Sequence, residues 1–347
     1  MSFLGPKLLL KIDNRLRQAF PRQQHEPFGG LSIILVGDLG QLPPVMDKPL
    51  YASHSTALAL WHSFQTVVTL DTSFRQQGAS NIQQQFRAIL QNIRNANPLQ
   101  TNWEALMSRS SSKLPIDHNK HFDNSIHLFA TNASVKHHNT KMLKQLHLPV
   151  ARCLAQNSRQ TNPEYNNDEQ LPSELLLSLN EQVMLIANLW IQAGLVNGSL
   201  GQIRSIIYDT DSRPPDLPKY VVVEFKNYSG PHWDNANPKF VPIPPITRGS
   251  RTQLPLAMAW ALTIHKSQGL TLDKATVDIG KAEKQGLTFT ALSRVKSLHD
   301  LRTEPLFSFE RYSKLQSNAY TTMRKKEENR LSALSIQISA SPPHQQL

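Results

Sequence analysis

The chain has 347 residues, which is enough for about two domains that each bury a core. Its 37 Lys and Arg residues against 26 Asp and Glu give a net charge of +11, which favours an anionic partner, nucleic acid more often than a membrane surface. A single cysteine, Cys153, excludes an internal disulfide framework and a cysteine-based zinc site. No apolar run reaches the length of a membrane span, so we expect no membrane partner.

Two elements are predicted near the start of the chain. Residues 1–20 place apolar side chains along one helical face and basic ones elsewhere, which predicts an amphipathic helix. Residues 31–36, LSIILV, predict a buried strand, and the stiff polar loop GDLGQLPP follows it. Because ligands bind where strands of an α/β sheet end, Asp38 and Gln41 in this loop are candidate site residues. Asp38 also has the position of a Walker-type magnesium ligand, since it follows a hydrophobic strand.

The next part of the chain predicts a mixture of strands and helices. Residues 67–76 predict a strand that runs into Arg75, and residues 81–95 have the period of a helix. Residues 126–130 predict a further strand, followed by a helix that ends near Leu146. An arginine after an apolar strand is usually a surface charge, so Arg75 by itself indicates no function.

Residues 181–253 contain short strands separated by glycines and prolines, which predicts a small β-barrel. Within it, Asn197-Gly198 predicts a hairpin turn. Trp233 and Tyr228 are candidates for stacking on bases, with packing in a barrel loop as the alternative. The polar residues 313–347 predict a disordered tail.

Residues 253–278 combine three signals. Apolar residues at steps of three and four between Leu256 and Ile264 predict a short helix. Polar side chains then precede Gly269, where the chain can turn sharply and bring backbone N–H groups close to an anion. Alternating residues from 275 to 279 predict a strand. Without further information, a helix with a solvated polar end is the alternative interpretation.

The segment AWALTIHKSQGLTL in this region closely resembles the late motif of superfamily-one DNA helicases, and the surrounding chain resembles their petite integration frequency (Pif) type, with its Helitron and RecD-like relatives. Further segments that match are GDLGQLPPV, VVTLDTSFRQ, GLVNGSLGQI and GLTFTALSRVKSL. The resemblance implies an α/β fold, the P-loop NTPase (RecA-like) helicase core. It places the rear of a first RecA-like domain in residues 1–66, a second such domain in residues 67–180 and 254–312, and an inserted SH3-like β-barrel in residues 181–253.

The resemblance also implies roles for single residues. Gln41 would sense the γ-phosphate of ATP, and Asp38 would lie near the attacking water and magnesium. We prefer this sensor role for Asp38 because the residues on either side of it belong to the sensor motif. Arg75 and Arg294 would be arginine fingers, and Gly269 would join them in binding nucleotide. The residues implied in DNA contact are Thr263, His265, Lys266, Ser267 and Gln268.

The implied function is a 5′-to-3′ ATP-dependent DNA helicase in DNA repair, recombination and telomere maintenance. Its cofactors would be ATP and Mg²⁺, and its partners single-stranded DNA and DNA junctions. We expect a monomer in the nucleus, with the mitochondrion as a second compartment. No stretch reads G-x-x-x-x-G-K-[ST], and the Asp-Glu magnesium motif is missing, so we expect a C-terminal part of an enzyme that does not hydrolyse ATP alone. The alternative is a catalytically dead, transposon-derived remnant that binds single-stranded DNA.

Overall fold

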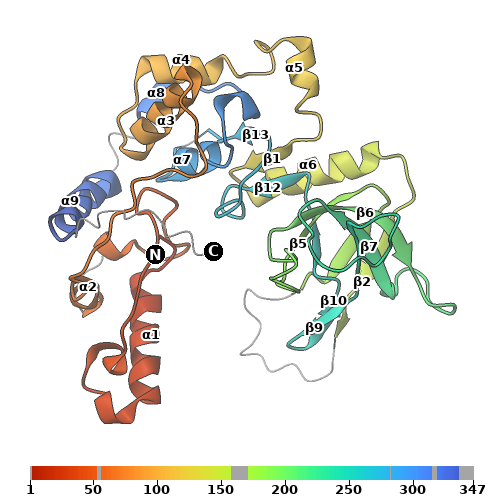
Figure 1. Ribbon diagram of the computed structural model, residues 1–347, viewed down its shortest axis with the longest axis horizontal. Coiled ribbons are helices and arrows are strands. Elements are labelled where there is room, and N and C mark those ends of the chain that lie inside the picture. The colour runs from red at the N-terminus through yellow and green to blue at the C-terminus, as the bar shows by residue number, and fades with distance from the viewer. Residues whose placement is uncertain (1, 53–55, 158–170, 282, 315–318, 336–347) are drawn as a thin grey trace, which may run out of the picture. The chain divides into compact units, whose positions relative to one another are not determined.

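A computed structural model describes residues 2–52, 56–157, 171–281, 283–314 and 319–335. The chain divides into two compact units, which are described separately below (Figure 1). Unit 1 consists of Met1–Asp123 and Thr271–Leu347, and unit 2 of Asn124–Leu270. Within the part of the chain that the structure describes, no helix combines the length and apolar character needed to cross a membrane. The domain boundaries implied by the resemblance stay a prediction.

Unit 1 is mainly helical (Figure 1). Its α-helices are α1 (Pro6–Ala19), α2 (Thr56–His62), α3 (Asn81–Arg94), α4 (Gln100–Met107), α5 (Ile116–Lys120), α7 (Leu287–Leu292), α8 (Phe309–Ser313) and α9 (Ala319–Ala333). Its 3₁₀ helices are η1 (Pro21–Gln23), η2 (Pro27–Gly30), η3 (Leu50–Ala52) and η5 (Leu298–Asp300). The strands β13 (Ala275–Asp278) and β14 (Leu301–Thr303) pair in parallel. Strand β13 confirms the strand predicted in that region.

Helix α1 confirms the amphipathic helix predicted for the start of the chain. Pro6 stands in its first turn, where the missing N–H of proline costs no intrahelical hydrogen bond. Leu9 is buried in a cluster with Phe28 and Trp61, so the apolar face of α1 packs on the core of unit 1. The buried Asp13 accepts a hydrogen bond of 2.6 Å from the backbone N–H of Phe28, which fixes the turn that leads into residue 31.

The strands predicted over residues 31–36 and 67–76 are wrong. The first segment forms no strand, and its Ile34 side chain is 87% exposed, although Ile33 and Leu35 pack against the core. In the second segment only Val67 makes an isolated β-bridge, and Leu70 is 85% exposed. An apolar run shows which side chains could be buried, but a buried strand also needs packing on both of its faces. Each of these segments has apolar side chains in water.

Unit 2 is mainly β-structure with one long helix, α6 (Asn132–Gln145). Its strands are β1 (Ile126–Phe129), β2 (Ala151–Leu154), β3 (Gln156–Asn157), β4 (Glu174–Leu177), β5 (Gln182–Leu185), β6 (Leu200–Ile207), β7 (Tyr220–Phe225), β8 (Phe240–Ile243), β9 (Ile246–Arg248), β10 (Arg251–Gln253), β11 (Leu256–Met258) and β12 (Ala261–Thr263). A five-stranded antiparallel sheet has the order β11-β5-β6-β7-β8. The SH3-like barrel stays a prediction, whereas β1 and α6 confirm the strand and helix predicted there.

The helix predicted between Leu256 and Ile264 is wrong, because this segment forms β11 and β12. Strand β11 pairs with β5 in antiparallel orientation, and β12 pairs with β1 in parallel. Leu256, Ala259 and Ile264 are fully buried, and Ala257 and Met258 are partly exposed, so the segment is largely enclosed. A short apolar run of this kind suits a buried strand as well as a helix, and its period alone does not separate the two.

The disordered tail predicted for residues 313–347 is wrong where the structure describes it. Residues 319–333 form α9, whose Arg324 and Glu327 are buried. The indole N–H of Trp61 donates a hydrogen bond of 2.7 Å to Glu327 Oε1. Because α9 buries charged side chains and has no apolar stripe, the hydrophobic pattern did not indicate it. Residues 315–318 and 336–347 lie outside the described part.

Candidate nucleotide and DNA sites

The two predicted arginine fingers meet in unit 1 around one serine. Arg75 donates hydrogen bonds to the Ser293 carbonyl oxygen (3.0 Å) and to Thr271 Oγ1 (2.8 Å). Arg294 donates to the Ser293 hydroxyl oxygen (2.7 Å) and to the carbonyl oxygen of Thr290 on α7 (2.8 Å). Two residues that are more than 200 positions apart in the sequence are therefore brought together by the turn that follows α7.

The electrostatics of this pair favour an anion. Arg294 is only 2% exposed, and burial, followed by repulsion from the Arg75 charge, lowers the pKa of Arg294 to about 10. Burial also lowers the pKa of Arg75. Arg294 remains a cation at neutral pH, but its burial and the neighbouring Arg75 charge disfavour the charged form. A phosphate group placed beside them would offset these unfavourable effects, and the arginine-finger roles of Arg75 and Arg294 stay a prediction.

Gln76, which the sequence did not indicate, supports the arginine pair. Its buried amide group donates to the carbonyl oxygens of Ser293 (3.3 Å) and Val295 (2.9 Å). The backbone N–H of Leu272 donates to the Arg294 carbonyl oxygen at 2.9 Å. These bonds fix the backbone on both sides of Arg294. In the sequence, the position of Gln76 directly after Arg75 was its only sign of a supporting role.

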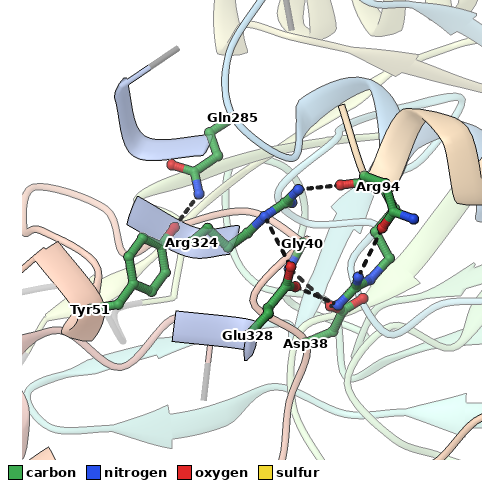
Figure 2. Close-up of polar contacts among 8 residues, drawn as sticks. Asp38, Gly40, Tyr51, Arg94, Gln285, Arg324 and Glu328 are labelled. Carbon is green, nitrogen blue, oxygen red and sulfur yellow. Dashed lines mark hydrogen bonds and ion pairs between the residues drawn. The ribbon is translucent and has the colours of Figure 1, made fainter. Parts of the chain in front are cut away.

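The loop that carries Asp38 and Gln41 is held by ion pairs (Figure 2). Asp38 Oδ1 accepts hydrogen bonds from the Gly40 backbone N–H (2.9 Å) and from two guanidinium nitrogens of Arg94 on α3 (2.7 and 3.0 Å). Arg94 also pairs with Glu328 of α9 at 2.8 Å. Sequence reasoning missed both Arg94 and Glu328, because nothing local links them to the loop.

In the structure, one oxygen of the Asp38 carboxylate has partners other than a metal ion. Its Oδ1 atom is already surrounded by one backbone N–H and the Arg94 guanidinium, which leaves the group neutralised by a neighbouring cation. Among the described residues, no group of three or more His, Cys, Asp or Glu side chains is placed to hold a metal ion. The position of Asp38 near water and magnesium therefore stays a prediction from resemblance.

Gln41 lies against the beginning of α7. Gly286, the residue before this helix, has a φ of 70°, and a Cβ atom there would overlap the carbonyl oxygen of Gln41. Only glycine combines this backbone conformation with so close an approach. The predicted sensor thus contacts one end of α7, and Arg294 follows the other end of the same short helix.

The predicted DNA-contacting residues form the end of β12 and the turn that follows it in unit 2. The Thr263 hydroxyl accepts a hydrogen bond from the Lys266 backbone N–H (3.2 Å), and the Ser267 hydroxyl donates to the Ile264 carbonyl oxygen (2.8 Å). Thr263 and Ser267 are buried, Lys266 is exposed, and His265 and Gln268 are partly exposed. Thr263 and Ser267 therefore shape the turn, while Lys266 presents a charge to the solvent.

Gly269 ends this turn with a φ of 89°, and the space where its Cβ would stand is open. It belongs to unit 2, whereas Arg75 and Arg294 belong to unit 1. Its predicted role in nucleotide binding stays a prediction.

The predicted hairpin turn at Asn197-Gly198 lies beside Leu270, which follows the turn that ends at Gly269. A Cβ atom on Gly198, whose φ is 96°, would stand 2.7 Å from the Leu270 side chain. Of the two stacking candidates, Tyr228 is buried and its hydroxyl donates to the Pro231 carbonyl oxygen (2.8 Å), so it packs within the fold. Trp233 is 54% exposed and offers a ring to the solvent.

Known proteins resemble this chain in sequence. The model of the family described as PIF1-like helicase matches residues 2–103. The human protein named ATP-dependent DNA helicase PIF1 is 32% identical over 291 residues, which cover 81% of this chain and 42% of the human protein. The mouse protein of the same name is 31% identical over 288 residues, covering 81% of this chain and 41% of that protein. The chain thus spans less than half the length of these relatives.

Solved structures resemble it in fold. The Pif1 helicase of Candida albicans matches with a TM-score of 0.71 and 26% identity, covering 95% of this chain and 74% of that one. A Bacteroides Pif1 in complex with ADP-AlF3 and single-stranded DNA matches with a TM-score of 0.63 and 22% identity, covering 96% and 74%, and this likeness concerns the fold alone. The mixed α/β units therefore have a RecA-like helicase fold. With its motifs in the family's order, the chain is similar in sequence and in fold to the PIF1-like helicases of superfamily one.

Proposed function

We propose that this chain is the part of an ATP-dependent DNA helicase that supplies arginine fingers to ATP and holds single-stranded DNA. The observation that carries the proposal is the meeting of Arg75 and Arg294 around Ser293, where both arginines have lowered pKa values. The human and mouse relatives are named ATP-dependent DNA helicases. The comparisons therefore favour a helicase over a catalytically dead remnant.

When bound, ATP would supply the phosphoanhydride bond whose cleavage drives the motor. Arg75 and Arg294 would hold the terminal phosphate, since a planar guanidinium spreads its donors over several phosphoryl oxygens. Gln41 is proposed as the sensor that couples phosphate occupancy to the loop before α7, because its backbone contacts Gly286. Mg²⁺ is proposed as a cofactor of the whole enzyme, with no ligand assigned among the described residues.

For DNA, we propose that Lys266 neutralises a backbone phosphate and that the turn at Gly198 borders the same strand. The exposed charge of Lys266 and the contact between Gly198 and Leu270 support this arrangement. Trp233 is the remaining candidate for base stacking, which is tolerant of sequence because every base has a π-face. His265 and Gln268 are proposed as further polar contacts.

The finer properties are proposals that rest on the family resemblance. They are 5′-to-3′ polarity, binding to DNA junctions, a monomeric state, and roles in repair, recombination and telomere maintenance. The nucleus is proposed as the compartment, with the mitochondrion as a second location.

The DNA part is tested by titrating labelled oligo-dT against the chain at several salt concentrations. Each neutralised phosphate contributes a slope of about −0.7 to log affinity against log salt. We expect Lys266→Ala to make that slope shallower by about one such unit. Lys226→Ala, which removes another exposed lysine of unit 2, is the matched control and should leave the slope nearly unchanged.

Duplex DNA of equal length is the second control. Duplex binding as tight as that of oligo-dT, or equal slopes for the Lys266 and Lys226 variants, would mean that the net charge of +11 acts diffusely and that the turn after β12 does not track DNA.

A further inference from the structure

Helix α9 docks on unit 1 through charged side chains. Its Arg324 is only 3% exposed, and its buried Glu327 accepts hydrogen bonds from Trp61 (2.7 Å) and from Arg330 (2.7 Å). Burying a charge is costly unless it is paired and hydrogen-bonded. A helix that only covered a core would bury apolar residues, so the position of α9 is specified by these polar partners.

The contacts of α9 continue to the loop of the sensor motif (Figure 2). Glu328 accepts a hydrogen bond from Arg94 at 2.8 Å, and the same Arg94 nitrogen donates to Asp38 at 2.7 Å. Asp38 in turn accepts from the Gly40 backbone N–H at 2.9 Å. All three charged side chains are about one quarter exposed, so their attraction is less screened than that of a surface pair. Burial lowers the pKa of Arg94, but the carboxylates of Asp38 and Glu328 raise it above its ordinary value.

Arg324 contacts both α3 and the loop. Its guanidinium donates a hydrogen bond to the carbonyl oxygen of Arg94. Arg94 is the last residue of α3, where carbonyl oxygens have no N–H partner within the helix. A Cβ atom on Gly40 would stand 2.6 Å from Arg94 Cγ and 3.2 Å from Arg324 Nη1, so the two arginines touch the loop backbone. Gly40, Arg94, Gly286 and Arg324 also line a cavity of about 230 Å³. Leu39 and Leu42 of the loop are buried, and on the side of Gly40 the ion pairs connect the loop to α3 and α9.

We propose that α9, acting through Arg94, positions the loop Asp38–Leu42, and that Arg94 and Glu328 are positioning residues for Gln41. The Asp38 carboxylate serves in this arrangement as the anchor of the loop. The inference deepens the proposed function, and it rests on that function only for the claim that Gln41 senses phosphate. The packing of α9 against the loop can be tested without ATP or DNA.

Amide hydrogen exchange of the full chain tests the proposal. In Glu328→Gln we expect exchange of residues 38–42 to rise by about threefold or more, while the midpoint of thermal unfolding and exchange elsewhere in unit 1 change little. Glu310→Gln is the matched control, because Glu310 pairs with the exposed Lys314 at 3.3 Å and lies outside this cluster. Unchanged exchange of residues 38–42 in Glu328→Gln would overturn the proposal, as would a uniform rise across unit 1 together with a lower unfolding midpoint.

Three further variants separate the effect of charge from the effect of side-chain shape. Arg94→Gln should raise exchange of the loop more than Arg94→Lys, which keeps the charge but loses the planar fork. Asp38→Asn should act as Arg94→Gln does, with no nucleotide or metal added. If Arg94→Gln and Asp38→Asn both leave the loop protected, α9 does not position it. Oligo-dT binding by unit 2 reports on the proposed function separately, so a chain that binds no DNA but shows these exchange effects would reject that function and support this inference.

Discussion

Two buried arginines of unit 1 differ in their surroundings. Arg311 donates to Glu283 (2.5 Å) and to the carbonyl oxygens of Ile279 (2.7 Å) and Gly280 (2.8 Å), so its charge is neutralised within the fold. Arg294 instead faces Arg75, and its pKa is lowered to about 10. A perturbed cation next to a like charge is typical of a binding site, whereas a neutralised one is typical of a structural role. The resemblance singled out Arg294, and the structure adds that the two arginines have different neighbours.

The buried carboxyl group of Glu181 in unit 2 should make the stability of the protein depend on pH. Its side chain is buried, one oxygen accepts from the Ser178 backbone N–H (2.9 Å), and burial raises its pKa from 4.5 to about 8. Because the folded pKa lies above the ordinary value, the stabilisation is complete below pH 4.5 and is lost as the pH rises through about 8. We expect the free energy of unfolding to fall across this window by up to about 1.4 kcal/mol per pH unit.

The measurement is urea unfolding at several pH values, compared between the natural chain and Glu181→Gln. The variant should lose this part of the pH dependence. Glu174→Gln, at an exposed carboxylate of the same unit, should keep it. An identical pH dependence in all three proteins would show that Glu181 does not carry a raised pKa.

At the scale of elements, α6 holds β12 in place through one buried side chain. Asn139 accepts a hydrogen bond from the Ala261 backbone N–H (2.8 Å) and donates to the Ala261 carbonyl oxygen (3.2 Å). Asn139→Leu would leave two buried backbone groups unsatisfied, which costs about 1–3 kcal/mol each. We expect a loss of at least about 2 kcal/mol in the free energy of unfolding.

Chemical denaturation of the two variants Asn139→Leu and Gln145→Ala, the second at an exposed position of the same helix, measures this difference. The Gln145 variant should stay within about 0.5 kcal/mol of the natural chain. Equal losses in both variants would mean that Asn139 does not hold β12, and that another contact places the turn after it.

The helices that were predicted correctly have local signals in the sequence. The helices α1, α3 and α6 each have an apolar period or a clear capping residue, such as Ser80 before α3, whose hydroxyl accepts from the Gln83 N–H. These signals are local. A strand, by contrast, depends on a partner strand elsewhere, which is why residues 31–36 and residues 67–76 were misassigned. Helix α9 lacks an apolar stripe and depends on partners such as Trp61, 266 positions away from Glu327.

At the scale of the whole molecule, the chain spans 42% of the human relative, and its sequence contains no G-x-x-x-x-G-K-[ST] stretch. That loop cradles phosphates with its backbone N–H groups and its lysine. Arg75 and Arg294 can stabilise a terminal phosphate but do not replace such a cradle. We therefore expect this 347-residue chain to release no phosphate from ATP above background, with or without DNA.

A coupled phosphate assay with oligo-dT measures this. Turnover of about one per second or more, the usual scale of enzymes, that disappears in Arg294→Ala would show that the phosphate site was misplaced. The Arg294→Ala variant is assayed in the same way as the control. Turnover that persists in this variant would indicate a contaminating ATPase.

The sequence by itself indicated the likeness to PIF1-like helicases, because the wording and order of its motifs are properties of the chain and need no coordinates. It also determined the amphipathic α1, the basic charge, and the identity of Arg75, Arg294, Gln41 and Lys266 as candidates. The tertiary structure alone decided that Asp38 is bound to Arg94, that Arg75 and Arg294 share Ser293, and that Leu256–Thr263 forms strands. Each of these depends on groups far apart in the chain, such as Arg94 and Glu328 at a separation of 234 residues. Local periodicity carries no information about such partners, because they meet only when burial and ion pairing bring distant segments together.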